Sequence, residues 1–225
     1  MAKRNTGDLG PFIITNTNGK ATIKHQSAPL PTNKEELEAF FGDKFVSAFN
    51  KQKPFGETVA ITSSQQLGTE NLDYRIECEK ADYLELAEIT PLTEEWGREA
   101  LKSGVIDIYQ MGKWTWQEII GKKAVKYGDL CRRTFLLLYS THPSLLASQN
   151  LFDLLRSTLQ DKGCPFAGVF YELVIGGDTA FIEVLAPWKD KMPAPRTFKG
   201  MKLQNLNMRE ATSIGNAVFF GPSKI

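Results

Sequence analysis

Two carboxylates, Asp73 and Glu85, are the residues of this sequence whose spacing best suits chemistry. They lie in the stretch from Leu72 to Ile89, where apolar and polar residues alternate on both sides of a polar break at residues 79–82. Such alternation is typical of two half-buried strands, and the break predicts a hairpin. If both apolar faces pack on one core, Asp73 and Glu85 approach each other on the neighbouring face. Two adjacent carboxylates need a counterion or a shared proton, and a divalent metal ion is the usual solution.

An ordinary solvated strand face is the alternative interpretation of this pair. Arg75 shares a face with Asp73, because side chains alternate with a period of two along a strand. A cross-strand ion pair through Arg75 would stabilise the sheet without any catalytic role.

The charges are distributed unevenly along the chain, although the net charge is only +1. Ten acidic residues lie between Glu70 and Glu99. Basic residues gather in two later groups: Lys113, Lys122, Lys123, Lys126, Arg132 and Arg133, then Lys189, Lys191, Arg196, Lys199 and Lys202. An acidic centre beside basic flanks suits a metal site that acts on a polyanion. Two merely solvated basic faces are the alternative.

Composition sets broad limits on the class of protein. The 225 residues, 42% hydrophobic and 24% charged, are enough for one good core. No run approaches the roughly 20 apolar residues of a membrane span, and the first ten residues lack the apolar segment of a secretory signal. The sequence therefore predicts a cytoplasmic protein without membrane contact. The cysteines, Cys78, Cys131 and Cys164, show no paired spacing, which argues against a disulfide framework or a zinc site.

The elements that must position the carboxylates follow from periodicity and from start and stop signals. Residues 1–32 are expected to be an irregular N-terminal segment, residues 33–186 an α/β domain, and residues 187–225 a C-terminal extension. Within the domain we expect a helix capped by Asn33, a strand at Thr58–Thr62, a polar loop at residues 63–71, the hairpin, a helix at Trp116–Tyr127, a fully buried strand at Thr134–Tyr139, a helix at Ser148–Lys162, and a second hairpin formed by residues 167–175 and 180–185. The intervening residues 105–109 fit either a strand or a buried turn. This order predicts an α/β fold with a mixed central sheet flanked by helices.

The same order resembles the core of the PD-(D/E)xK nuclease superfamily. That family has a helix, a three-strand meander with an Asp at the start of the second strand and an acidic residue on the third, then a helix and a buried strand. The later segments IIGKKAVKY, TFLLLY and FAGVFYEL are similar to the second half of divergent members. The resemblance covers about residues 33 to 186, and it implies a restriction endonuclease-like core.

The resemblance assigns residues one by one. It implies that Asp73 and Glu85 hold one or two Mg²⁺ or Mn²⁺ ions, with Glu38 on the first helix as an accessory acid. Gln117 would be the polar residue from the second helix. Two departures from the motif stand out: Leu72 replaces a frequent Pro, and Ala87 replaces the family's Lys. In some members of the superfamily this lysine is replaced by a cation from another position. In this sequence the candidates for that role are Arg75, Lys122 and Lys126.

Two functions are compatible with these residues. One is a metal-dependent nuclease that hydrolyses DNA phosphodiester bonds with a water nucleophile. The other is a catalytically inactive protein of the same fold that acts as a nucleic-acid-binding or protein-assembly module. DNA is the expected partner, and a homodimer is an assembly that the sequence allows. Ala87 is the residue on which the choice depends.

Overall fold

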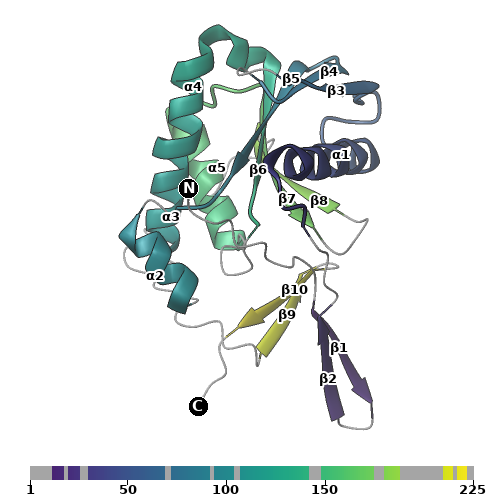
Figure 1. Cartoon of the computed structure of the whole chain (residues 1–225), viewed down its shortest axis with the longest axis vertical. Helices are drawn as coiled ribbons and strands as arrows, with labels where there is room; N and C mark the ends of the chain where they lie inside the picture. Colours follow the sequence, from purple (N-terminus) through teal and green to yellow (C-terminus); the bar gives the residue numbers. More distant parts are fainter. Residues whose placement is uncertain are drawn as a thin grey trace.

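The computed structural model describes residues 12–17, 20–25, 30–68, 72–91, 94–103, 107–141, 148–174, 180–187, 210–214 and 217–221. Its centre is a six-stranded sheet with helices on both faces (Figure 1). Two separate two-stranded sheets pair β1 (Phe12–Thr17) with β2 (Lys20–His25) and β9 (Glu210–Ile214) with β10 (Ala217–Gly221). Among the described residues, no helix combines the length and the apolar character needed to cross a membrane.

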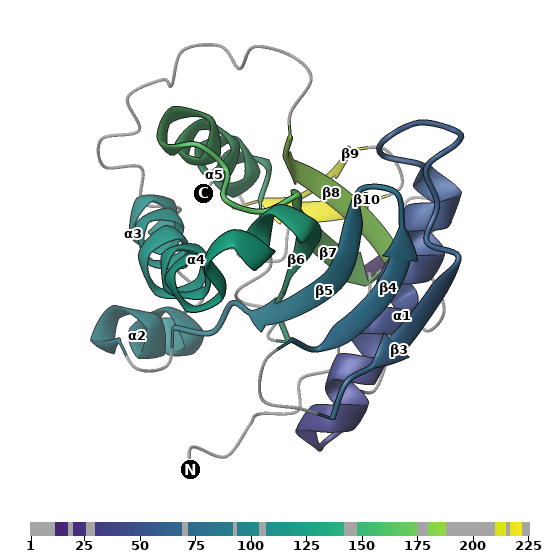
Figure 2. The same cartoon turned by 90° about the horizontal axis from the view of Figure 1, so that it is seen from above.

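The large sheet is mixed, as the sequence predicts. Its strands follow in spatial order β3 (Ser63–Gln66), β4 (Tyr74–Cys78), β5 (Ala81–Glu88), β6 (Thr134–Tyr139), β7 (Gly168–Val174) and β8 (Ala180–Ala186). The central strands β5, β6 and β7 are parallel, and the outer pairings are antiparallel. Parallel neighbours need long crossover connections, and these connections carry every described helix except α1, which precedes β3 (Figure 2).

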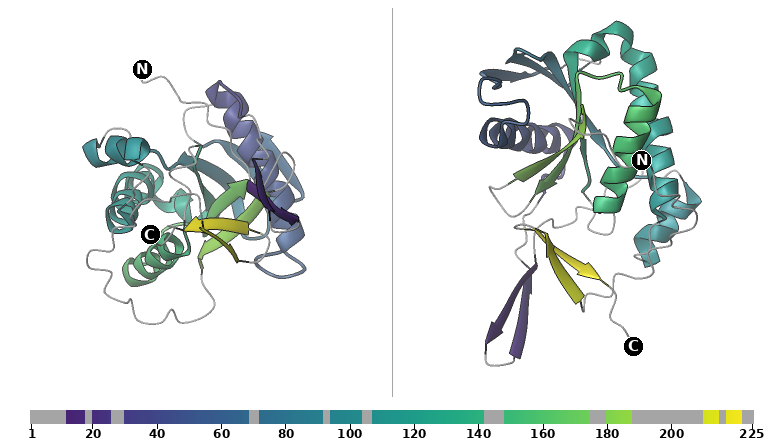
Figure 3. Two further views of the ribbon diagram at one scale, coloured as in Figure 1. Left: turned by 90° about the horizontal axis from the view of Figure 1, so that it is seen from below. Right: turned by 180° about the vertical axis from the view of Figure 1, so that it is seen from behind.

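The helices divide between the two faces of the sheet. On one face lies α1 (Lys34–Gln52), which Asn33 caps by accepting a hydrogen bond from the Glu36 N–H. The other face carries α3 (Ile108–Trp114), a π-helix η1 (Thr115–Gly121), α4 (Lys122–Tyr127) and α5 (Gln149–Lys162) (Figures 2 and 3). The short helices α2 (Glu95–Ser103) and η2 (Gly128–Arg133) flank this second layer.

On the α1 side, the core is built from phenylalanines. Phe41, Phe45 and Phe49 recur every four residues and so point from α1 to the sheet. Phe135 of β6 and Phe170 of β7 meet them, with ring centroids 5.5 Å apart for Phe49 and Phe135 and 5.2 Å apart for Phe45 and Phe170. All five side chains are fully buried.

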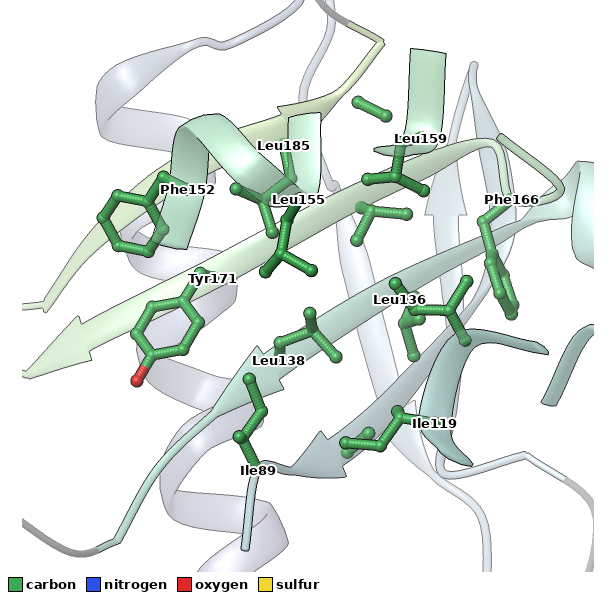
Figure 4. Packing of buried hydrophobic residues seen from close by; sticks show 14 of the residues in the cluster. Ile89, Ile119, Leu136, Leu138, Phe152, Leu155, Leu159, Phe166, Tyr171 and Leu185 are labelled. Atoms are coloured by element: carbon green, nitrogen blue, oxygen red, sulfur yellow. The ribbon is translucent and has the colours of Figure 1, made fainter. Parts of the chain in front are cut away.

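On the opposite side, the core is mainly aliphatic, with a few aromatic residues. Leu136 and Leu138 of β6 lie in one cluster with Leu155 and Leu159 of α5 (Figure 4). Because β6 is buried on both faces, all six of its side chains are buried, and this confirms the predicted central strand.

Four local predictions are wrong. The strand expected at Thr58–Thr62 lies instead at Ser63–Gln66, within the expected polar loop. All four β3 side chains are exposed, so this edge strand has no apolar alternation that could reveal it. Val59 and Ile61 are buried in extended chain, where the Asn50 side chain bonds the Ile61 N–H and C=O at 2.8 and 2.9 Å.

The second error concerns Leu72, which the alternation places on one strand face with Tyr74 and Ile76 but which packs in the opposite cluster. It precedes β4, so the alternation of the strand does not govern it. The third concerns β5, which is an interior strand buried on both faces rather than half-buried. The fourth concerns residues 105–109: Ile108 and Tyr109 begin the helix α3 and form neither a strand nor a buried turn. The turn of the second hairpin lies outside the described residues.

Glu172 of β7 is a buried carboxyl group on the α1 side of the sheet. Its side chain is 2% exposed, and neither carboxyl oxygen has a hydrogen-bond partner among the described residues. Burial raises the pKa of Glu172 well above its ordinary value of 4.5, and the charge of Lys44 on α1 opposes this only partly. The group is therefore expected to keep its proton in the folded state above pH 4.5.

Glu172→Met is expected to raise the free energy of unfolding by about 1–3 kcal/mol at pH 8, the usual cost of unsatisfied buried polar groups. The gain should shrink toward pH 4. Above pH 4.5 the unfolded chain releases the proton that folded Glu172 retains, so wild-type stability falls as pH rises. Urea unfolding of both proteins from pH 4 to 8 measures the difference, with exposed Glu77→Met as the control. A gain that is independent of pH would contradict the buried-acid interpretation.

Candidate functional site

Asp73 and Glu85 lie on the same side of the sheet, next to α4. Asp73 directly precedes β4, and both carboxylates line one hollow, where the charge of Asp73 acts on Glu85. Asp73 Oδ2 accepts a hydrogen bond of 2.7 Å from the Leu86 N–H. This bond holds the carboxylate against β5 and leaves its second oxygen as a potential ligand. In β5 the residues alternate, so Leu84 and Leu86 point toward α1 while Glu85 points toward α4.

Glu85 is a buried carboxylate in which one oxygen has hydrogen-bond donors and the other has none among the described residues. Its Oε1 forms an ion pair with Lys123 Nζ and accepts a hydrogen bond of 2.8 Å from the Tyr127 hydroxyl. Among the described residues, no donor reaches Oε2, although the side chain is only 4% exposed. Burial raises the pKa of Glu85, Lys123 opposes this shift, and the nearby charge of Asp73 adds to it.

A hollow of about 370 Å³ opens over these carboxylates. It lies between the N-terminal turns of α1 and the helix α4, at the carboxyl ends of the parallel strands β5 and β6. Acidic and basic side chains share its lining: Glu38, Asp73, Glu85, Glu88 and Glu118 with Lys34, Lys123 and Lys126. The hollow therefore combines carboxylate oxygens with three ammonium groups.

The structure separates the remaining predicted site residues into two sets. Glu38 lines the hollow, with its side chain 13% exposed and 3.2 Å from Lys34 Nζ. Arg75 is exposed, lies outside the lining and acts electrostatically on Asp82. Lys122 pairs with Glu118, and both Lys122 and Gln117 are exposed outside the lining. Neither Arg75 nor Lys122 thus lies where the absent lysine side chain would be.

Lys123 and Tyr127 are the residues that sequence reasoning missed. A signal for both existed, because Ile119, Lys123 and Tyr127 recur every four residues and so share one helix face. Lys122 instead lies four residues after Glu118, with which it forms an ion pair, and it does not line the hollow. The π-helical turns of η1 shift the helical register before α4, and such turns often occur at functional sites.

The residues present fit a hard divalent cation with few protein ligands. Within the described residues, no three His, Cys, Asp or Glu side chains converge on one point, so Glu38 does not complete a triad with Asp73 and Glu85. Mg²⁺ commonly takes one or two carboxylates and fills its other positions with water and substrate phosphate. The orphan Oε2 of Glu85 is the kind of buried lone pair that such an ion would satisfy.

Comparison of the chain with protein-family models, curated proteins and solved structures found no match in any of the three.

Proposed function

We propose that the protein is a metal-dependent nuclease with a restriction endonuclease-like core, which hydrolyses phosphodiester bonds of DNA. One observation carries the proposal. Glu85 is buried beside Asp73, its Oε1 is neutralised by Lys123, and its Oε2 lacks a partner among the described residues. The location supports it, because ligands of open α/β sheets bind outside the carboxyl ends of the parallel strands.

In this proposal, Asp73 and Glu85 hold Mg²⁺ or Mn²⁺. When bound, the ion polarises a phosphoryl oxygen and lowers the pKa of water. Lys123 is the cation beside the acidic pair, so its ammonium would stabilise the negative charge that develops on the phosphate. It would replace, from α4, the lysine that is absent at Ala87. Lys34 and Lys126, at the rim of the hollow, would contact neighbouring phosphates of the strand.

The test is cleavage of supercoiled plasmid, linear duplex and single-stranded DNA by the purified chain with Mg²⁺ or Mn²⁺. Asp73→Asn and Glu85→Gln are each expected to lower the rate by about 100-fold or more, since metal catalysis contributes several kcal/mol and 1.36 kcal/mol is tenfold in rate. Glu77→Gln is the matched control, because Glu77 is exposed on β4 and lies outside the hollow. Cleavage that persists in EDTA, or in both site variants, would overturn the proposal.

A non-catalytic nucleic-acid-binding protein is the second candidate, and the Lys123–Glu85 ion pair favours it. This pair balances the charge of Glu85 without any metal. In that case the chain should bind DNA equally well in EDTA and in Mg²⁺, without cutting it. Asp73→Asn and Glu85→Gln should then leave the binding unchanged.

A further inference from the structure

Tyr127 is the second residue that α4 brings to Glu85. Its ring is buried in the aliphatic core, and the residue is 7% exposed. The hydroxyl group reaches past this core to Glu85 Oε1 at 2.8 Å. The ring therefore anchors the hydroxyl on a rigid element rather than on a mobile loop.

The direction of the hydroxyl proton follows from Lys126. Lys126 Nζ lies 3.0 Å from the Tyr127 hydroxyl and 4.7 Å from the ring centroid. An ammonium group has donors and no acceptor, so Lys126 donates to the hydroxyl oxygen. The hydroxyl must then direct its own proton to Glu85 Oε1.

Oε1 of Glu85 thus receives two donors, and this fixes the orientation of the whole carboxylate. Lys123 supplies a charge, whereas Tyr127 supplies a neutral hydrogen bond. The neutral donor has a particular advantage beside a cation site, because it holds a carboxylate without repelling a divalent ion. The other oxygen, Oε2, keeps its lone pairs.

We propose that Tyr127 is a positioning residue: it holds Glu85 by Oε1, leaves Oε2 without a donor among the described residues, and so sets the affinity of the site for divalent metal. The inference rests on the proposed function, since it concerns the same metal site. Hydrogen-bond partners of metal-ligating carboxylates commonly contribute 10–100-fold to metal affinity or activity. Sequence resemblance does not point to this tyrosine.

The experiment is calorimetric titration of the full chain with MgCl₂ and with MnCl₂ in the absence of DNA. Tyr127→Phe keeps the ring in the core and is expected to weaken metal binding by about 10–100-fold. Tyr127→Met lacks the ring as well, and an equal loss would assign the effect to the hydroxyl. Tyr83→Phe is the control, because Tyr83 packs against the same core but does not line the hollow. Circular dichroism verifies that each variant is folded.

A kinetic comparison adds a result that a purely structural role would not produce. In Tyr127→Phe, cleavage should fall at low Mn²⁺ and recover toward the wild-type kcat at saturating Mn²⁺, with the KM for DNA unchanged. Equal metal affinity of the wild type and both Tyr127 variants would overturn the positioning role and leave the proposed function standing. A wild type that binds neither ion would overturn both.

Discussion

Leu137→Asp is expected to leave the chain unfolded at 25 °C. Leu137 is fully buried in the middle of β6. This strand lies between β5 and β7, and helices cover both faces of the sheet. An unpaired carboxylate at this point costs several kcal/mol or more, and the lost leucine contacts cost about 2–5 kcal/mol in addition. Their sum is comparable to the 5–15 kcal/mol that ordinarily stabilises a domain.

Circular dichroism and urea unfolding measure this effect. Leu130→Asp is the matched control, because Leu130 lies in η2 and is 50% exposed. It should change the free energy of unfolding by no more than about 0.5 kcal/mol, as is usual for surface sites. If Leu137→Asp unfolded cooperatively with a midpoint like that of the wild type, β6 could not be the central strand.

Lys123→Met should lower DNA cleavage by about 100- to 1,000-fold, the usual effect of removing one group that stabilises transition-state charge. Methionine keeps most of the side-chain volume, so the change removes mainly the ammonium beside Glu85. Lys122→Met, one residue earlier, is the control. Lys122 is exposed, pairs with Glu118 and does not itself line the hollow, so that variant should cleave at nearly the wild-type rate. Equal activity of the two variants would show that Lys123 is not the catalytic cation.

A sharper experiment places a lysine on β5 at position 87, where the PD-(D/E)xK motif has one. Ala87 follows Glu85 by two residues on the same face of β5, is 6% exposed and lines the hollow. In a Lys123→Met background, Ala87→Lys is expected to restore activity by about tenfold or more, because the new ammonium supplies the charge beside Glu85 that the methionine lacks. Ala87→Lys alone should instead lose stability, since it places a second cation beside Lys123. If the double variant cleaved no faster than Lys123→Met, the site would not accept a cation from β5, and the non-catalytic alternative would gain support.

Local patterns in the sequence were sufficient for much of the framework. Alternation in residues 84–87 separates Leu84 and Leu86 from Glu85 and Ala87, because successive strand side chains point to opposite faces. The continuous apolar run Thr134–Tyr139 predicts a strand covered on both sides. The Asn33 cap and the regular phenylalanine spacing of α1 likewise depend only on nearby residues. These features of the sequence also place Asp73 and Glu85 on one side of the sheet.

Other features depended on contacts between distant segments. The edge strand β3 exists because its backbone pairs with β4, and its four polar side chains contribute no pattern. Which lysine meets Glu85 depends on the rotation of α4 over the sheet, and the π-helical turns of η1 alter the register of the helix that leads into it. Glu85 is buried, and its Oε2 lacks a hydrogen-bond partner among the described residues, only because α4 covers β5. Glu85 and Lys123 are 38 positions apart in the sequence. The sequence therefore specified the carboxylate pair, Asp73 and Glu85. Tertiary packing decided which cation and which hydrogen-bond donors meet Glu85, because the rotation and register of a helix are set by side chains far apart in the chain.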